Sequence, residues 1–345
     1  MRTKRKVSAL LAAGAMLFSL CAPFAFAEEG AGEVKDTGPA ANTFALARAG
    51  DTYLDENGED QPIPDGVTEV TDSTTSLGDG WYIVRGDVTV DDISTTPIDV
   101  TGDTSLILGD SYTLKVPGGI IVNDGASLTV YAQSDEGDMG TLEAGGMSAG
   151  ITCNNGTLVI NGGNIVATSY GNVSIGGSGG TITIYGGTVN QKTPDSEKKG
   201  IGGTGFDITI NGGTVEADSS SIDDLAGISG DSITITGGTV TATGGKNAAG
   251  IGGGSGEAGG TITISGGKVT ATGGENAAGI GGGNGGAGGN ISITGGDVTA
   301  QGNPATSSSI SNNYNVGGAG IGGGLNGDGG IIIIDGDTTD RKSVV

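Results

Sequence analysis

The residues best suited to chemistry form one regularly spaced set, and each member ends a short run of alternating apolar residues. The set comprises Tyr131, Asn161, Tyr185, Asn211, Thr236, Ser265 and Thr294, and all but Tyr131 stand directly before a Gly-Gly pair. Aromatic rings stack on the apolar faces of sugar rings, and amides and hydroxyls hydrogen-bond to sugar hydroxyls. Tyr131, Asn161, Tyr185 and Asn211 are therefore our candidate carbohydrate-binding residues.

The same set also has a purely structural interpretation. Asn suits a bend that needs a positive φ, stacked amides can form a ladder, and Tyr can pack along its neighbours. If the alternation places the set in one outward column, Tyr131 and Tyr185 lie two turns of chain apart, roughly 10 Å. That spacing resembles one disaccharide repeat of an extended glycan, so both interpretations stay open.

Residues for acid–base catalysis are sparse, because the chain contains no His. The nearest carboxylate pair is Asp223 and Asp224, which we expect in a solvated turn. Lys246 and Lys268 fall at different points of the repeat and do not converge with it. We expect no catalytic residue and no enzyme. The alternative is a polysaccharide-active enzyme of the pectate-lyase type, which would need basic and acidic groups on one face.

Metal and polyanion binding are also disfavoured. The glycine-rich corners read GGGSGEAGG and GGGNGGAGG and lack the aspartates of calcium-binding coils. We therefore expect no metal site and no cofactor, only adventitious calcium at acidic corners. The formal net charge of −24 repels nucleic acid and anionic lipid.

A repeat of 29 residues determines how these side chains are positioned, with units starting at Ser232, Thr261 and Asn290. Each unit holds three short segments in which β-branched residues alternate with polar ones, the pattern of half-buried strands. Gly-Gly pairs separate the segments and allow sharp turns. One unit cannot bury its apolar side alone, so we expect successive units to stack.

Weaker copies of the unit extend the repeat in both directions. Further starts are predicted at Trp81, Ser105, Ser127, Thr157, Thr181, Asp207 and Ile331, and the third segment carries an isoleucine that recurs from Ile98 to Ile321. We predict an all-β fold, a right-handed parallel β-helix (a solenoid) of about nine to ten rungs over residues 79–339. The hand follows the general preference of parallel crossovers.

The two ends of the sequence differ from the repeat. Residues 1–27 have a basic start, an apolar run and an Ala25-Phe26-Ala27 cleavage site, which predicts a secretory signal peptide. The apolar run is short for a membrane span. Residues 28–78 are polar and acidic, and we predict an acidic flexible leader with a possible cap on the coil at its end. Residues 340–345 interrupt the repeat, and we interpret them as a non-native tail of a truncated fragment with an uncapped, self-associating last rung.

The segment GGTITISGGKVTATGGENAAGIGGG resembles the glycine-rich parallel β-helix regions of secreted surface proteins of gut Firmicutes. Those regions are often described as carbohydrate-binding domain-containing, and the resemblance covers about Trp81 to Gly336. It implies a bacterial protein that is secreted or associated with the cell wall, and it carries over no ligand residue. We therefore expect a non-enzymatic adhesin or stalk that binds a polysaccharide or a host or cell-surface glycan. A purely structural spacer remains a further alternative.

Overall fold

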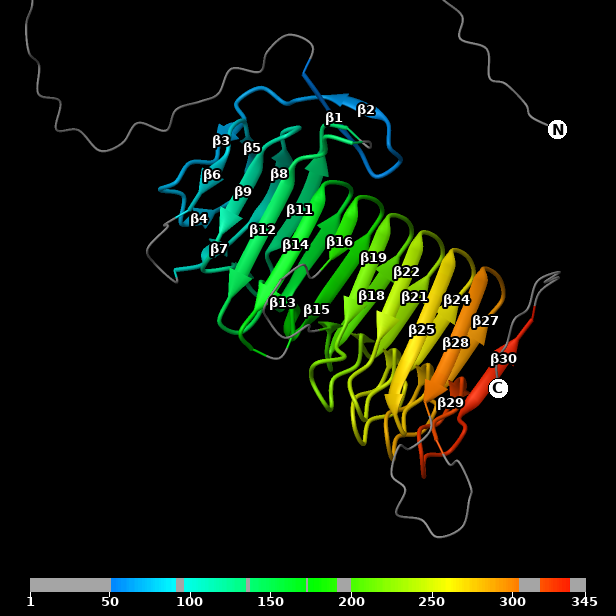
Figure 1. The fold of residues 1–345 in the computed structure, drawn as a ribbon. Helices are drawn as coiled ribbons and strands as arrows, with labels where there is room; N and C mark the ends of the chain where they lie inside the picture. The colour runs from blue at the N-terminus through cyan, green and yellow to red at the C-terminus, as the bar shows by residue number, and fades with distance from the viewer. Residues whose placement is uncertain are drawn as a thin grey trace, which may run out of the picture. The chain divides into compact units, whose positions relative to one another are not determined.

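The structure is a computed structural model that describes residues 51–90, 96–134, 137–171, 173–190, 200–303 and 317–335. The predicted signal peptide, residues 28–50 of the predicted leader and the predicted tail (340–345) lie outside these ranges. Within them every regular element is a β-strand, and the strands wind into a parallel coil with three faces (Figure 1). The predicted all-β parallel β-helix is confirmed.

Each turn of the coil supplies one strand to each face, and these faces are named here in chain order. The first face, in register along the coil, contains β5 (Gly80–Val84), β8 (Asp103–Leu108), β11 (Ser127–Ala132), the C-terminal parts of β13 (Ile151–Ile160) and β15 (Ile175–Ile184), β18 (Phe206–Ile210), β21 (Ser232–Ile235), β24 (Thr261–Ile264), β27 (Asn290–Ile293) and β30 (Ile331–Ile334).

The second face is a nine-stranded sheet of its own, which lies toward the viewer in Figure 1. It contains β6 (Val88–Thr89), β9 (Thr113–Val116), β12 (Thr141–Gly146), β14 (Asn164–Ser169), β16 (Thr188–Asn190), β19 (Thr214–Asp218), β22 (Thr239–Thr243), β25 (Lys268–Glu275) and β28 (Asp297–Asn303). With one strand per rung, these nine strands are separated by about eight turns of the chain.

The third face is built from the shortest strands. It contains β7 (Ile98–Val100), β10 (Ile120–Val122), the N-terminal parts of β13 and β15, β17 (Ile201–Gly202), β20 (Ile228–Ser229), β23 (Ile251–Gly252), β26 (Ile280–Gly281) and β29 (Ile321–Gly322). Because β13 and β15 bend from this face into the first, both faces belong to one 19-stranded sheet.

The register of the strands agrees with the predicted repeat at all but one step. The recurring isoleucine of the third segment pairs with itself from Ile98 through Ile120 and onward to Ile321. On the first face, however, Ser105 pairs with Thr129 and not with Ser127. The predicted alignment is therefore wrong by two residues there. A shift of two keeps every side chain on the same side of the strand, so the apolar pattern could not reveal it.

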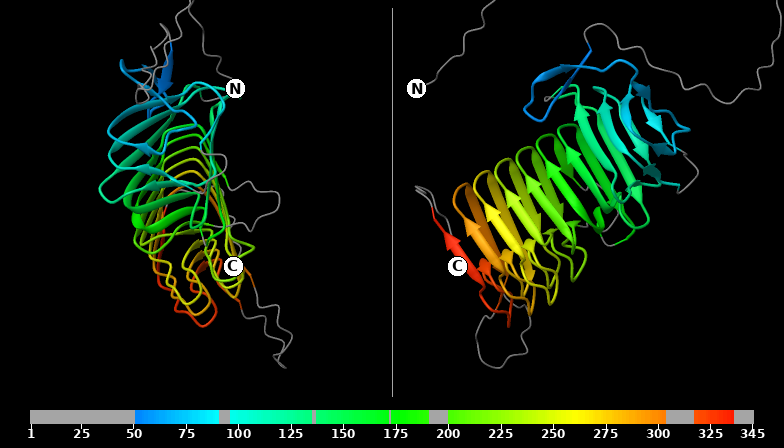
Figure 2. Two further views of the ribbon diagram at one scale, coloured as in Figure 1. Left: turned by 90° about the vertical axis from the view of Figure 1, so that its left-hand side faces the viewer. Right: turned by 180° about the vertical axis from the view of Figure 1, so that it is seen from behind.

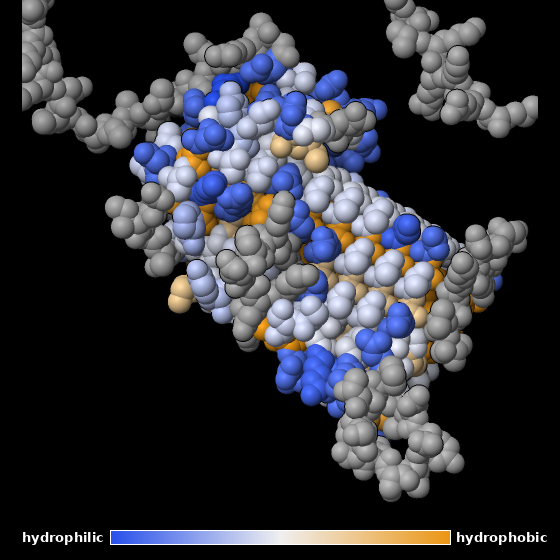
Figure 3. All heavy atoms as spheres, in the orientation of Figure 1, coloured by the Kyte–Doolittle hydropathy of each residue, from blue (hydrophilic) through white to orange (hydrophobic). Residues whose placement is uncertain are grey.

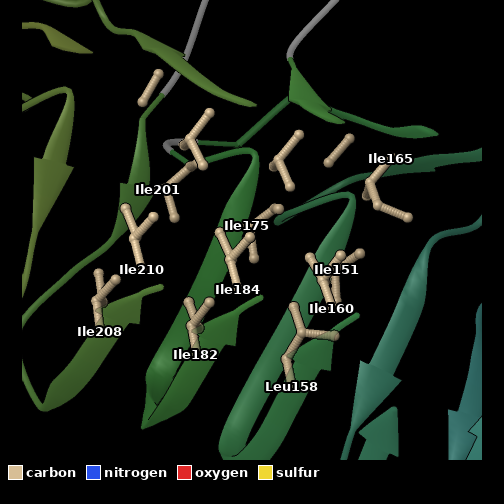
Figure 4. Close-up of a cluster of buried hydrophobic side chains, with 14 of the residues drawn as sticks. Ile151, Leu158, Ile160, Ile165, Ile175, Ile182, Ile184, Ile201, Ile208 and Ile210 are labelled. Atoms are coloured by element: carbon tan, nitrogen blue, oxygen red, sulfur yellow. The ribbon is translucent and has the colours of Figure 1, made fainter. Parts of the chain in front are cut away.

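The core is a set of isoleucine and valine columns inside the coil. Figure 4 shows Leu158, Ile182 and Ile208 from successive first-face strands next to one another, with Ile160, Ile184 and Ile210 in the adjacent column. All six side chains are at most 1% exposed. Burial of each such side chain contributes about 1.5–3 kcal/mol, so the stack is stabilised by many equivalent contacts between rungs.

Glycine is required at the corners between the first and second faces. The second glycine of three successive corners has a positive φ: Gly238 (80°), Gly267 (82°) and Gly296 (88°). A Cβ atom on Gly267 would lie 2.8 Å from the carbonyl group of Gly237 in the rung before it. The corners therefore stack so closely that a side chain fits neither the backbone conformation nor the space.

Residues 51–78 form a cap on the start of the coil. β1 (Thr52–Leu54) and β2 (Asp60–Pro62) make an antiparallel hairpin, whereas β3 (Thr68–Glu69) and β4 (Ser76–Leu77) pair in parallel with β5 and β7. Val67 and Val70 are almost fully buried. This stretch corresponds to the cap that the sequence suggested at the end of the leader, and the sheet begins about ten residues before the predicted boundary at 79. Figure 2 shows the hairpin in blue next to the first rungs.

None of the described residues belongs to a helix long and apolar enough to cross a membrane.

Candidate carbohydrate-binding face

The structure places the candidate residues in one outward column on the first face. Val130, Ile160, Ile184 and Ile210 pair in register and point into the core, so the residue that follows each of them points outward. These following residues are Tyr131, Asn161, Tyr185 and Asn211. The backbone continues the ladder at this level, since Asn161 N–H donates to the carbonyl of Val130.

Tyr131 lies under the cap and differs in environment from Tyr185. Its ring stacks on Trp81 with 5.2 Å between centroids, and it meets the edge of Tyr53 of β1 at 4.9 Å. Burial raises the pKa of the Tyr131 hydroxyl, and the nearby Tyr53 raises it further. These three rings pack against Ile63, Val67, Ile83 and Ile107. Tyr131 thus packs as the structural interpretation expects, and Trp81 occupies one face of its ring.

Tyr185 is the open aromatic residue of the column. Its side chain is 38% exposed, and it follows β15 at the corner with Gly186 and Gly187. Tyr185 lies two turns of the coil from Tyr131, but the two rings do not offer equivalent surfaces for stacking on a sugar. A sugar ring could stack on Tyr185 without moving any other aromatic side chain of the described residues.

The two asparagines of the column are held by the coil in different ways. The Asn211 Oδ1 atom accepts a hydrogen bond of 2.7 Å from the hydroxyl of Thr236, its neighbour in the next rung. The Asn161 Oδ1 atom is buried and has no hydrogen-bond partner. Such an atom costs about 1–3 kcal/mol. Asn211 therefore contributes to a polar ladder like the one that the structural interpretation describes, whereas the Oδ1 atom of Asn161 does not.

Two further outward columns complete the first face, and sequence reasoning missed them as candidate ligand contacts. They alternate with the buried isoleucines of β15, β18, β21, β24 and β27. The central column holds Thr183, Thr209, Thr234, Thr263 and Ser292, and the column before it holds Thr181, Asp207, Ser232, Thr261 and Asn290. The repeated T-I-T-I pattern was the available signal. With the candidate column they form a regular array of hydroxyl and amide groups in which Asp207 is the one charge.

The residues considered for catalysis are engaged elsewhere in the described part of the chain. Asp224 accepts a 3.0 Å hydrogen bond from the side-chain amide of Asn247, whose backbone N–H donates to the carbonyl of Asp223. These contacts are those of a corner stacked on the next corner. Lys246, the residue before Asn247, lies 3.8 Å from Glu275 of the following rung. Among the described residues no group of three or more His, Cys, Asp or Glu side chains could hold a metal ion.

Comparison with known proteins supports the architecture. Residues 208–232, 233–255 and 262–284 each match the model of a family described as Beta helix repeat. Each match spans about one turn, from a first-face strand to the third face. The chain is a parallel β-helix protein. The searches of curated proteins and of solved structures returned no match. The comparisons therefore support the fold of this β-helix protein. Any ligand has to be inferred from the residues on its own surface.

Proposed function

We propose that this β-helix protein is a secreted or cell-surface adhesin or stalk whose first face binds an extended carbohydrate. The observation that carries the proposal is the hydroxyl and amide array on β15, β18, β21, β24 and β27, which repeats at the rung spacing of about 4.8 Å. A linear glycan also repeats along its length, so equivalent sugar units could meet equivalent protein groups.

The chemistry of the array favours a neutral or weakly charged polysaccharide or cell-surface glycan. Hydroxyls and amides both donate and accept hydrogen bonds and cost less to desolvate than charged groups, and the exposed Tyr185 ring offers an apolar face. The overall charge of −24 argues against nucleic acid and other polyanions as partners. The proposal includes no catalytic step, because Asp224 is hydrogen-bonded to Asn247 and Lys246 is paired with Glu275. It includes no cofactor and no structural metal.

The location is inferred from the sequence. The predicted signal peptide supports export, and the likeness to glycine-rich β-helix regions of surface proteins supports a place on a bacterial cell wall. A coil in which each rung is bonded to the next is suited to hold a binding face away from such a surface.

A glycan array tests the proposal. The wild-type protein is expected to bind at least one extended polysaccharide, and a Tyr185→Ala/Asn211→Ala double variant is expected to lose most of that signal. Thr241→Ala, on the second face, is the matched control and should bind as wild type does. A folded wild-type protein that binds no glycan would contradict the proposal and favour a structural spacer. Release of reducing ends from a bound polysaccharide would instead favour the lyase-like or hydrolytic alternative.

A further inference from the structure

A hollow of about 260 Å³ lies on the second face, away from the proposed glycan array. It spans β9, β12 and β14, and its lining includes Lys115, Pro117, Glu143, Gly145 and Thr168. Figure 3 shows this face of the molecule, where rows of weakly polar side chains alternate with apolar ones. Pockets that hold drug-sized ligands have volumes of about 300 Å³ or more. A smaller hollow therefore suits a single sugar ring better than a larger molecule.

The hollow exists because one outward position has no side chain. Gly145 pairs with Thr168, and it follows Ala144, which pairs with Val116 directly before Pro117. Pro117, Gly145 and Thr168 therefore stand in one outward column on successive rungs. A Cβ atom on Gly145 would lie 3.3 Å from the Thr168 hydroxyl oxygen and 3.4 Å from the Pro117 carbonyl oxygen. A larger side chain would grow out into the hollow.

One wall of the hollow is an ion pair that a ligand can reach. The Lys115 Nζ atom lies 3.3 Å from the Glu143 Oε2 atom, and the two side chains are 51% and 45% exposed. Lys115 offers hydrogen-bond donors and Glu143 offers acceptors. Their charges cancel, so the wall favours a neutral group with adjacent hydroxyls over an anion or a cation. Thr168 supplies a further hydroxyl from the next rung.

An exposed aromatic residue lies further along the chain from Thr168, just beyond the lining of the hollow. Tyr170 is two residues beyond Thr168, about 7 Å along the chain, and its side chain is 82% exposed. Its backbone N–H donates to the carbonyl of Gly146 at 2.9 Å, which fixes it at the edge of this face. An aromatic ring left in solvent forfeits the burial that most aromatic side chains obtain. Tyr170 is thus placed to cover a sugar held in the hollow or the next sugar along.

We propose that the Gly145 hollow is a second carbohydrate site, which takes one pyranose unit of a neutral glycan. The sugar hydroxyls bridge Lys115 and Glu143, the ring occupies the space over Gly145, and Tyr170 packs on the ring or on its neighbour. The site stands on its own observations, because none of its residues belongs to the first face.

Saturation-transfer NMR tests this site with the methyl pyranosides of glucose, galactose, mannose and N-acetylglucosamine. At least one should receive saturation from the wild-type protein, and Gly145→Val should reduce the transfer at least fivefold by filling the hollow. The backbone at Gly145 is not in the left-handed region, so valine suits this strand position. Lys115→Met, which keeps the length of the side chain, should reduce the transfer as well and guards against misfolding of the glycine variant.

The controls separate the two sites. Thr241→Val places the same residue on the second face away from the hollow and should leave the transfer unchanged. Tyr185→Ala should also leave it unchanged, even where it abolishes binding on the glycan array. No transfer to any of the four sugars by the wild-type protein would overturn the proposal. Transfer to a folded Gly145→Val variant equal to that of wild type would overturn it as well.

Discussion

Cys153 shows how completely the coil removes a reactive group from solvent. Its thiol points into the core of β13 and is fully buried, and burial raises its pKa to about 12 from 9.0. Because only the thiolate is nucleophilic, Cys153 behaves as a small apolar core residue in the folded protein.

The buried thiol gives a residue-scale prediction about reactivity. At pH 8 the shifted pKa alone lowers the thiolate fraction by about 10³, and burial adds a barrier to access. A disulfide reagent should therefore label Cys153 of a Cys21→Ser variant very slowly in buffer and rapidly in guanidinium. Labelling at similar rates in both solvents would show that the third face opens readily.

The stacked glycine corners give a second residue-scale prediction, in which two causes of strain can be separated. Gly267 and Gly256 both have a positive φ, but a Cβ on Gly267 meets the backbone of the rung before it and a Cβ on Gly256 meets nothing within 4 Å. Gly256→Ala should cost about 1 kcal/mol of unfolding free energy from the backbone conformation alone. Gly267→Ala should cost about 2 kcal/mol or more, because the clash of the new Cβ atom with the rung before it adds to the strain of the backbone conformation.

Denaturant unfolding of the two variants measures this difference. Gly78→Ala is the control, since Gly78 has neither a positive φ nor a close neighbour, and it should be near neutral. Equal losses for Gly256→Ala and Gly267→Ala would mean that the corners can move apart to accept a side chain.

At the scale of elements, one carboxylate ties together the turn of the β1–β2 hairpin. The Asp55 Oδ1 atom accepts hydrogen bonds from the backbone N–H groups of Glu59 and Asn57, and the Oδ2 atom accepts one from the Gln61 side chain. These bonds favour the charged form and hold the pKa of Asp55 below its usual value of 3.8. Its contribution to stability is therefore complete above about pH 4 and is lost as the pH falls through the folded-state pKa.

Trp81 reports on this hairpin, because it is the single tryptophan of the chain and lies 5.0 Å from the Tyr53 ring of β1. On acidification below pH 4 its fluorescence should shift to longer wavelength as the hairpin loosens. Asp55→Asn should show a looser hairpin already at neutral pH and a smaller change on acidification. If the variant titrates with the same amplitude as wild type, Asp55 does not hold the hairpin.

Elements differ in how far the sequence could predict them. The alternation around Ile182, Ile208 and Ile233 is local and repeats, so the strands, the faces and the outward column follow from pattern alone. The cap on Tyr131 could not be read in this way, since Tyr53 and Val67 belong to no repeat and meet Tyr131 through tertiary packing. The Gly145 hollow was hidden for another reason: in a chain with 74 glycines, one missing side chain on a strand carries no local signal.

At the scale of the whole molecule, the two ends of the described coil contrast. At the N-terminal end Ile63 and Val67 of the cap pack against Ile83 and Ile107 of the first rungs, and all four side chains are buried. At the other end the β30 side chains are all exposed: Ile331 by 63%, Ile332 by 39%, Ile333 by 54% and Ile334 by 41%. Exposed apolar strands of this kind invite pairing with another chain.

The protein is therefore expected to self-associate through β30. Light scattering behind a sizing column should show mass rising with concentration, and Ile332→Glu/Ile334→Glu should return the protein toward the monomer. Thr241→Glu, which adds one charge on the second face, should not. A wild-type protein that stays monomeric at every concentration would show that other parts of the chain protect this strand in solution.

Binding of an extended carbohydrate along successive rungs of the first face makes affinity depend on ligand length, which calorimetric titration over a series of oligosaccharide lengths measures. The series would be cut from whichever polysaccharide the glycan array identifies. Kd should fall with each added sugar unit until the ligand spans β15 to β27, and Thr234→Lys, in the middle of the array, should abolish this dependence on length. An affinity that is independent of length, or unchanged by Thr234→Lys, would show that the glycan does not bind along successive rungs.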